Sequence, residues 1–457
     1  MQTKFNHRNL HDYKGQNVLL LQGPVGPFFA RFAADLMEAG AATVTKVNFH
    51  AGDWLFYRQN AVRFVGRMQD WPEFLSQLLD TRKIDTVFLY GDCRPVHVDA
   101  LKLAKERGLR VGVFEEGYLR PNHITLEQWG VNGHSTLPRD PQAYLDMPAL
   151  PDLLERSVGK SYWHMVWWGF LYFTVGALGR LWHSDPLHHR DLSLLEARPW
   201  VRSAWRKLWY RWKQRAVMPT LLRCWGQRYF LVPLQVYNDS QVSVHSRFDS
   251  IEQFIELVIL SFAASAPRRT ALVFKHHPMD RGYRDYRPLI DRMSRTNDLI
   301  GRVFYIHDQH LPTLLDHARG VVVINSTVGL QALRHGSAVK VMGNAVYNIR
   351  GLTYQGSLAS FWRHAPAARP NQRLLRQFVR YLKHENQVNG SFYKKCTLSS
   401  KSATGIEWSK ATPTLTPKGA RNWLYQQPPK PSANASTMAA NDILDARANW
   451  LSPASDK

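Results

Sequence analysis

Two series of alternating strand and helix patterns constrain this chain more than any other feature of its sequence. In each series, short apolar runs of strand length are separated by stretches whose apolar residues recur at helical spacing. The first series has strand patterns at 17–22, 43–48, 86–90 and 110–114, with helical patterns at 28–36, 73–79 and 99–107. The second has strand patterns from 229 and at 271–275, 303–306, 321–324 and 338–342, with helical patterns at 311–317 and 330–335. This alternation predicts parallel sheets covered by helices on both faces.

The lengths of the two series predict two α/β domains. The chain has 457 residues, which is too long for one ordinary core and long enough for two. We expect an N-terminal Rossmann-like domain over 1–150, an insert over 151–228 and a C-terminal Rossmann-like domain over 229–390. Residues 396–457 are rich in Ser, Thr, Pro, Lys and Ala and lose periodicity, which predicts a disordered tail.

Net charge and cysteine content restrict the partners and the compartment. The formal net charge of +23 favours polyanionic partners, a class that includes nucleic acid, anionic lipid, sugar nucleotides and acidic polysaccharides. Cys93, Cys224 and Cys396 show neither paired nor metal-like spacing, and residues 1–16 lack the apolar core of a secretion signal. We therefore expect a cytoplasmic protein with reduced cysteines.

The predicted insert, residues 151–228, is unusually aromatic and basic. It carries nine of the 16 Trp residues, and thirteen Lys and Arg against five Asp and Glu give it a net charge of +8. Its uncharged run, 166–179, is shorter than the roughly 20 apolar residues that span a bilayer. The following segment, 203–215, interleaves three Trp with cations at helical spacing, as in helices that lie in a lipid headgroup layer. A Trp-rich helical pair packed on the protein's own core is the alternative, and no nucleic-acid-binding motif accompanies the charge.

Two adjacent carboxylates, Glu115 and Glu116, follow the last strand pattern of the first series. This position corresponds to the C-terminal edge of a parallel sheet, where open α/β folds bind their ligands. One of the two carboxyls could serve as a general acid or base, because a neighbouring like charge and partial burial raise a carboxyl pKa. The alternative interpretation is an acidic cap before a turn.

Two polar motifs follow strand patterns of the second series, about 50 residues apart. The first places a cation and an imidazole at the edge of the sheet, and the second places two hydroxyls and free N–H groups at a helix start. Each alone is more often a turn or a helix cap, but together they predict a nucleotide pocket. Their candidate binding residues are Lys275, His277, Pro278, Asn325, Ser326 and Thr327.

Asp239 and Gln235 lie in a polar cluster at the entry to the second series. Asp239 could act as a nucleophile or as an electrostatic partner of an oxocarbenium-like centre, and an Asx-turn is the alternative. Near the N-terminus, the Gly23–Gly26 loop has the sequence GPVG and does not match the dinucleotide fingerprint G-x-G-x-x-G. We interpret Gly23 as part of a close-approach loop that lines the cleft.

Four motifs in this order resemble the KpsS/LipB family of capsular polysaccharide proteins. They are FEEGYLRP from residue 114, PLQVYNDSQ from 233, KHHP from 275 and NSTVG from 325, and the likeness covers roughly 16–390. The resemblance implies a GT-B-like α/β fold, with two Rossmann-like parallel-sheet domains that face a cleft and, here, an aromatic and basic helical insert. It also implies a retaining β-Kdo transferase that uses CMP-Kdo and builds the Kdo linker between capsule polysaccharide and lyso-phosphatidylglycerol at the inner membrane.

The resemblance also implies roles for individual residues and for the domains. Asp239 of the Gln-x-x-x-Asp pattern is similar to the catalytic carboxylate, and Glu115 or Glu116 to the acid/base. Lys275, His277, Ser326 and Thr327 resemble the CMP-binding set, which puts the donor in the C-terminal domain and the acceptor in the N-terminal one. Other capsule synthesis and export proteins are the expected protein partners. We further infer that the insert holds the enzyme on the cytoplasmic face of the inner membrane, near its phospholipid acceptor.

No cofactor or metal ion is expected beyond the donor itself. An Asp-x-Asp metal motif is missing from the sequence, and a CMP-sugar has one phosphate, which needs less neutralising than a diphosphate. Two other functions remain open: a CMP-sialic acid-type transferase on the same scaffold, and a non-catalytic membrane adaptor of a capsule assembly complex. The adaptor would not need the carboxylate of Asp239.

Overall fold

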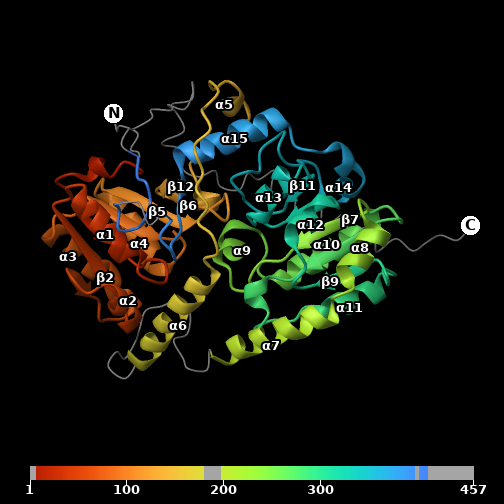
Figure 1. The fold of residues 1–457 in the computed structure, drawn as a ribbon, viewed down its shortest axis with the longest axis horizontal. Helices are drawn as coiled ribbons and strands as arrows, with labels where there is room; N and C mark the ends of the chain where they lie inside the picture. The colour runs from red at the N-terminus through yellow and green to blue at the C-terminus, as the bar shows by residue number, and fades with distance from the viewer. Residues whose placement is uncertain (1–6, 180–196, 397–400, 410–457) are drawn as a thin grey trace, which may run out of the picture. The chain divides into compact units, whose positions relative to one another are not determined.

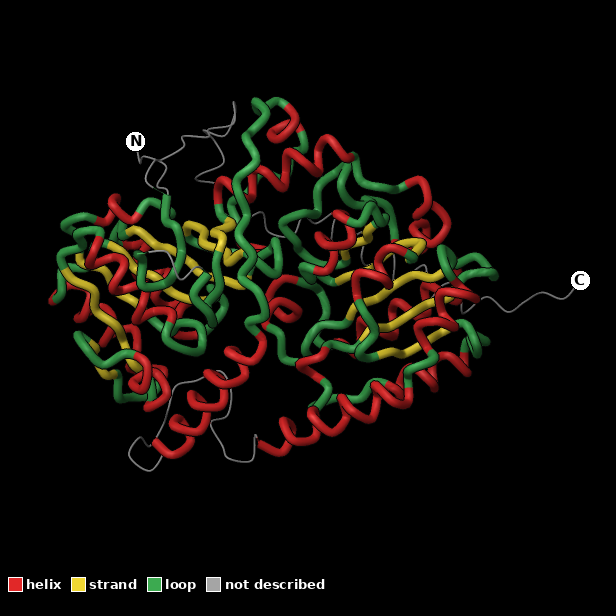
Figure 2. Tube along the Cα trace, viewed as in Figure 1, coloured by secondary structure: helices red, strands yellow, loops and turns green. Residues whose placement is uncertain are grey.

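The computed structural model describes residues 7–179, 197–396 and 401–409, and these residues form two compact α/β units. The first unit combines residues 7–136, 149–179, 379–396 and 401–409, and the second combines 137–148 and 197–378. Figure 2 shows strands enclosed by helices in each unit. The α/β fold class is confirmed, with two Rossmann-like parallel sheets and the aromatic, basic helices.

The first unit is built on a seven-stranded sheet of order β12-β6-β5-β4-β1-β2-β3. Its parallel strands are β1 (Asn17–Leu20), β2 (Thr43–Asn48), β3 (Ala61–Arg63), β4 (Thr86–Tyr90) and β5 (Arg110–Glu116). At one end, β6 (His123–Gln128) pairs antiparallel with β5, and β12 (Gln387–Asn389) pairs antiparallel with β6. The chain thus returns to this sheet after completing the second unit.

Helices cover both faces of the first sheet because successive strand residues point to opposite sides. On one face, Val18, Phe88 and Phe114 pack with the aromatic residues of α1 (Phe28–Glu38). On the other face, Leu19 and Val87 pack with α3 (Trp71–Thr81) and α4 (Pro95–Glu106). The unit also contains the short helix α2 (Ala51–Phe56) and the longer helix α6 (Tyr162–Gly179), which contact each other.

The second unit has a five-stranded sheet of order β11-β10-β7-β8-β9, in which every pair is parallel. Its strands are β7 (Tyr229–Pro233), β8 (Ala271–Lys275), β9 (Val303–Ile306), β10 (Ala318–Val323) and β11 (Val339–Val341). The residues of β7 and β8 are all buried, as expected of strands covered on both faces. Polar side chains are therefore confined to the strand ends and the loops that follow.

The helices of the second unit connect its strands and flank them (Figure 1). Much of the core comes from α10 (Ile251–Ser265) and α14 (Leu358–His364), which pack on Phe230 and Leu272. The remaining helices are α5 (Gln142–Leu145), α7 (Ala197–Lys213), α8 (Val217–Trp225), α9 (Ser240–His245), α11 (Arg287–Thr296), α12 (Leu311–Asp316) and α13 (Val328–Arg334). A further helix, α15 (Gln372–Glu385), begins in the second unit and ends in the first. Within the described part of the chain, none of the helices has both the length and the apolar character needed to cross a membrane.

The boundaries of the two units differ from the linear division expected from the sequence. The segment 151–228 does not form a separate body, because α6 belongs to the first unit whereas α7 and α8 belong to the second. Residues 137–148 also belong to the second unit, and the chain after 378 returns to the first. The pairing of β12 with β6 gives the physical reason for this return.

Part of the expected tail is ordered in the first unit. Asp35 is a buried carboxylate on α1, and it accepts hydrogen bonds from the backbone of Ala403, from Thr404 and, at 2.9 Å, from Trp408 Nε1. Ile406 of the same segment is buried in the core. Residues 401–409 therefore correct the expectation of disorder, whereas 397–400 and 410–457 lie outside the described residues.

Replacing Asp35 by Ala should detach the 401–409 segment and lower the free energy of unfolding by about 1–3 kcal/mol, because several buried donors lose their acceptor. Urea unfolding measures the loss, and limited proteolysis should show faster cleavage near this segment. Glu38→Ala, at an exposed position of the same helix, is the matched control. Equal stability of the two variants would contradict the role of Asp35.

Candidate functional site

Glu115 and Glu116 are the last two residues of β5, not the start of a loop after it. Both remain paired with β6, which argues against the alternative interpretation of an acidic cap before a turn, and the two side chains leave the strand on opposite faces. Glu115 Oε1 accepts the backbone N–H of Glu116 at 2.9 Å. Glu116 Oε1 accepts the hydroxyl of Tyr393 at 2.9 Å. The two carboxyls therefore have different surroundings and different chemistry.

Glu115 has the electrostatics of an acid/base group. Burial raises its pKa to about 7, against the opposing effect of the N–H of Glu116. A Cβ on Gly91 would lie 3.5 Å from Glu115 Oε2, so the residue after β4 must approach this carboxyl closely. The guanidinium of Arg94, which donates to Gln22 Oε1 at 2.8 Å, partly offsets the rise in pKa. Glu115 can exchange a proton near neutral pH, which selects it from the pair.

The Gly23–Gly26 loop follows β1 at the same edge of the sheet. Gly26 has φ +112°, and a Cβ there would lie 3.1 Å from the indole of Trp168 on α6. A Cβ on Gly23 would lie 2.7 Å from the ring of Phe29. Packing against aromatic rings thus explains both glycines, and the binding role of Gly23 stays a prediction.

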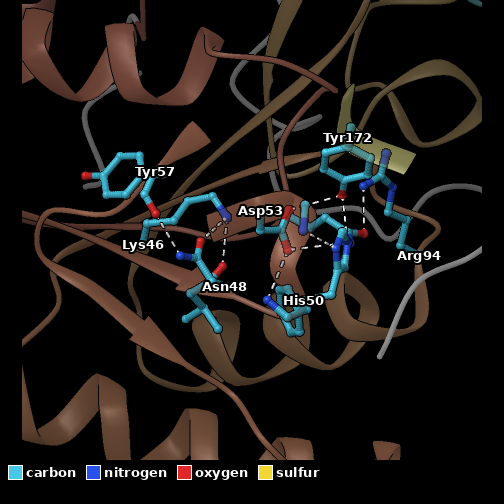
Figure 3. A network of polar contacts seen from close by, with 11 residues as sticks. Lys46, Asn48, His50, Asp53, Tyr57, Arg94 and Tyr172 are labelled. Carbon is cyan, nitrogen blue, oxygen red and sulfur yellow. Dashed lines mark hydrogen bonds and ion pairs between the residues drawn. The ribbon is translucent and has the colours of Figure 1, made fainter. Parts of the chain in front are cut away.

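A buried polar network anchors α6 on α2 near this edge (Figure 3). The hydroxyl of Tyr172 lies 2.9 Å from His50 Nε2 and 3.1 Å from Asp53 Oδ1. Beside them, the buried ammonium of Lys46 donates to Asn48 Oδ1 at 3.2 Å and to the carbonyl of Val47. Burial lowers the pKa of Lys46. The sequence analysis missed this network, because Tyr172 lies more than 100 residues after its partners His50 and Asp53.

Asp92, Cys93 and His134 form a cluster of side chains of metal-ligating type in the first unit. Their potential ligand atoms lie within 4.8 Å of one another. Asp92 Oδ2 already pairs with His134 Nδ1 at 2.9 Å and accepts the backbone N–H of Val131, and its Oδ1 accepts the thiol of Cys93. The hydrogen bond to Asp92 raises the pKa of His134. Asp92 thus already has hydrogen-bond partners in both His134 and Cys93. The expected independence from a metal ion remains a prediction.

In the second unit, Asp239 caps α9 and is held by a residue of its own motif, Gln-x-x-x-Asp. Asp239 Oδ1 accepts the N–H of Gln241 at 2.9 Å, and Oδ2 accepts the amide of Gln235 at 3.2 Å. Gln235 Oε1 in turn accepts the backbone N–H of Asn325 at 3.4 Å. The Asx-type cap that was one alternative is thus present, and it fixes a carboxylate just beyond β7.

The turn from β10 to α13 lies beside Gln235 and contains the predicted Asn325, Ser326 and Thr327. Asn325 donates to the carbonyl of Gln241 at 2.7 Å, and its buried Oδ1 has no hydrogen-bond partner within the described chain. Ser326 Oγ accepts the N–H of Val328 at 3.3 Å. Thr327 makes no side-chain cap contact. The Oδ1 atom of Asn325 is therefore an acceptor without a partner in the described chain, and the hydroxyl of Thr327 does not cap α13.

Lys275, His277 and Pro278 lie at the end of β8, on the other side of β7. The ammonium of Lys275 is buried and donates to the carbonyl of His307 at 2.9 Å, and burial lowers its pKa to about 8. His277 Nδ1 accepts the N–H of Met279 at 3.2 Å, so this imidazole caps the short turn that Pro278 begins. The predicted set is consequently split between a β7–β10 group and a β8–β9 group.

Several polar residues at the β8–β9 edge escaped the sequence analysis. His276 Nδ1 lies 2.6 Å from the hydroxyl of Tyr305, and the buried Arg281 forms an ion pair with Asp308. His307 and Asp308 follow β9 as His276 and His277 follow β8, so the rule that ligands bind at strand ends could have found them.

Comparison with known proteins places the chain in a family. The family model described as capsule polysaccharide biosynthesis protein matches residues 85–393. The capsule polysaccharide export protein KpsS of Escherichia coli is 44% identical over 387 residues, which cover 83% of this chain and 97% of that protein. The capsule polysaccharide modification protein LipB of Neisseria meningitidis serogroup A is 38% identical over 422 residues, covering 90% and 98%.

A solved structure is also similar. The Thermosulfurimonas dismutans KpsC, described as a beta Kdo 2,7 transferase, matches with a TM-score of 0.39 and 14% identity over 82% of this chain and 93% of that one. The family of this chain is shown by the family model and by the two relatives, and not by this structural likeness. The resemblance seen in the sequence motifs is confirmed, and this chain belongs to the capsule polysaccharide biosynthesis protein family.

Proposed function

We propose that this protein is a retaining β-Kdo transferase that uses CMP-Kdo to start the Kdo linker on phosphatidylglycerol or its lyso form. The observation that carries the proposal is the carboxylate of Asp239, held beyond β7 by Gln235 and Gln241 in a chain of this family. A carboxylate fixed in this way is suited to attack or stabilise an anomeric centre. Its family's role in capsule biosynthesis supports an acidic, nucleotide-activated sugar as the substrate.

The proposed reaction has two steps. The carboxylate of Asp239 attacks the anomeric carbon of Kdo, and the bond from that carbon to the CMP phosphate breaks, so that CMP leaves with the bonding electrons. The acceptor hydroxyl then attacks the same carbon, the bond to Asp239 breaks, and the hydroxyl proton passes to the carboxylate of Glu115. A pKa of about 7 supports this role, because Glu115 can accept the proton and release it at cellular pH.

The second unit offers the polar groups for the donor. Lys275 and Arg281 supply positive charge at the β8–β9 edge, and a CMP-sugar has a single phosphate to neutralise. Asn325 and Thr327 supply an acceptor and a hydroxyl at the β7–β10 edge. These groups support donor binding in the second unit, without a metal ion.

A lipid acceptor requires the enzyme to work at a membrane, and we place it on the cytoplasmic face of the inner membrane. The support comes from α6, whose outer residues Trp163, Trp167 and Phe170 are exposed while Gly169 and Tyr172 are buried against the first unit. Exposed aromatic residues of this kind suit a headgroup layer. Capsule synthesis and export proteins are the proposed protein partners.

Asp239→Asn should abolish turnover while leaving the fold intact, because Asn caps helices as well as Asp but cannot act as the nucleophile. The measurement is CMP release from CMP-Kdo with a lyso-phosphatidylglycerol analogue, and the expected loss is on the order of 10⁴-fold. Asp249→Asn, at an exposed carboxylate of the same unit, is the control. CMP-sialic acid, offered in parallel, separates the two donor specificities.

Failure of the wild type to release CMP from any CMP-sugar would favour the membrane adaptor. That alternative also predicts that Asp239→Asn restores capsule to a deletion strain as well as the wild type does. A transferase predicts no restoration by this variant.

Glu115→Gln should remove the acid limb of the pH–rate profile. In the wild type, the rate should rise with pH through about 7, as Glu115 loses its proton and becomes a competent base. The variant should be about 10²–10⁴-fold slower and show no such limb. Glu116→Gln, which keeps one acceptor oxygen for Tyr393, is the matched control and should retain the limb.

A stability measurement checks the same pKa without activity. Because the folded-state pKa of Glu115 is raised, its contribution to stability is complete below 4.5 and is lost as pH rises through about 7. Glu115→Gln should therefore melt at a higher temperature than the wild type at pH 8, and the difference should vanish at pH 4. A difference that does not depend on pH would refute the assignment.

Chelation should leave the activity unchanged. Wild-type protein treated with EDTA and then freed of it should release CMP at its original rate, and Cys93→Ser should do the same. Loss of activity that added Zn²⁺ restores in the wild type, but not in Cys93→Ser, would instead assign a metal to the Asp92–Cys93–His134 cluster.

A further inference from the structure

The helix α7, labelled in Figure 1, belongs to the second unit. Its side chains form two stripes of opposite character. The inner stripe is partly or fully buried and recurs at positions i, i+4, i+7, i+11 and i+15: Pro199, Ser203, Arg206, Tyr210 and Gln214. The outer stripe has the same spacing and is shifted by two residues: Val201, Trp205, Leu208 and Trp212. A shift of two residues turns by roughly 200° around a helix, so the stripes lie on opposite faces.

The inner stripe is held against the loops that follow β8 and β9. A Cβ on Gly282 would lie only 2.1 Å from the carbonyl oxygen of Pro199, so the backbones meet there. Arg206 donates to the carbonyl of Arg281 at 2.8 Å. The ring of Tyr210 stacks on His307 with centroids 3.6 Å apart and an interplanar angle of 13°. Gln214, just beyond the last residue of α7, accepts the N–H of His307 at 3.1 Å.

These contacts lead directly to the proposed donor site. The carbonyl of His307, the residue that Tyr210 and Gln214 hold, accepts the ammonium of Lys275 at 2.9 Å. The carbonyl of Arg281 binds Arg206, while its guanidinium pairs with Asp308. Displacement of α7 must therefore disturb the two cations, Lys275 and Arg281, that we propose for the donor phosphate.

The outer stripe faces solvent and suits a lipid interface. The exposed fractions are 71% for Val201, 62% for Trp205, 69% for Leu208 and 60% for Trp212. The helix carries six cations and no acidic residue, so any charge that borders the apolar stripe is positive. Five of the cations lie outside the inner stripe: Arg198, Arg202, Lys207, Arg211 and Lys213. Apolar side chains between flanking cations match the acyl boundary and anionic headgroups of a bilayer.

The same features argue against nucleic acid as the partner. Trp205 and Trp209 stack on each other with centroids 5.8 Å apart and an interplanar angle of 8°, which leaves fewer ring faces for bases. Val201 and Leu208 are aliphatic and offer no stacking or hydrogen bonds to a nucleotide. A bilayer can accommodate both the apolar side chains and the cations of α7, whereas nucleic acid would pair with the cations alone.

We infer that the outer face of α7 docks on an anionic bilayer surface and that its inner face transmits this docking, through Tyr210 and His307, to Lys275 in the donor site. The second half of the inference rests on the proposed function, because it assumes that CMP binds near Lys275. Linkage makes the coupling reciprocal, so lipid that raises the affinity for CMP must itself bind more tightly when CMP is present. The transferase would then bind its donor best when it is already on the membrane.

The experiment uses the full-length protein and vesicles of phosphatidylserine with phosphatidylcholine, which supply negative charge without the proposed acceptor. Wild type should sediment with these vesicles, less so at high salt, and should not sediment with phosphatidylcholine alone. The triple variant Trp205→Ala, Leu208→Ala and Trp212→Ala should bind about tenfold or more weakly. Ile300→Ala, at an exposed apolar position of the same unit, is the control.

The coupling is measured as the affinity for CMP by calorimetry, with and without vesicles. The vesicles should raise the affinity of wild type about fivefold or more, and CMP should raise vesicle binding by the same factor. Tyr210→Ala should still bind vesicles but lose this increase, and Tyr210→Phe, which keeps the stacked ring, should retain it. Thermal melting confirms that each variant is folded.

The outcomes separate the two halves of the inference. Vesicle binding by the triple variant at the wild-type level would overturn the docking surface. CMP binding that vesicles do not change, or an increase that Tyr210→Ala retains, would overturn the coupling. If CMP does not bind the wild type at all, the donor assignment and the coupling fail together, while the sedimentation result still decides the docking surface.

Discussion

Burial of the strands on both faces is the constraint on which the rest of this structure depends. Apolar side chains fill the two faces of β1, β4, β7 and β8, so that no polar side chain fits within the sheets without a partner. Polar groups are therefore pushed to the strand ends. Glu115 and Lys275 lie at the ends of buried strands, and Asp239 lies in the loop that follows β7, as this constraint requires.

The polar groups at these ends are fixed by hydrogen bonds and not by their position alone. Gln235 and Gln241 hold Asp239, and the N–H of Glu116 holds Glu115. Such bonds preorganise a carboxylate before any substrate arrives, and preorganised charge stabilises a transition state without reorganisation. The difference in environment between Glu115 and Glu116 also gives two neighbouring residues of the same type two different uses.

The aromatic helices α6 and α7 share one arrangement, each within its own unit. In the first unit, Tyr172 of α6 reaches His50 and Asp53, and Trp168 donates to the carbonyl of Tyr393, whose hydroxyl binds Glu116. In the second unit, α7 contacts His307 and thereby Lys275. Each helix thus presents aromatic residues to solvent and holds, through its inner face, the loops that carry the polar groups. This arrangement suits a family whose members act in the synthesis of a surface polysaccharide.

The sequence by itself determined the α/β class, the positions of most strands and the motifs that reveal the family, because hydrophobic periodicity and local motifs are properties of short segments. It also predicted a helix over 203–215, and α7 covers this segment up to Lys213, but only the structure decided that Trp205 and Trp212 are exposed. Only the tertiary structure decided that the pKa of Glu115 is about 7, since the burial that raises it is not a property of a short segment. The roles of His307, Tyr172 and Asp35 were likewise invisible, because each depends on partners that are distant in the chain and meet only when the sheets are formed.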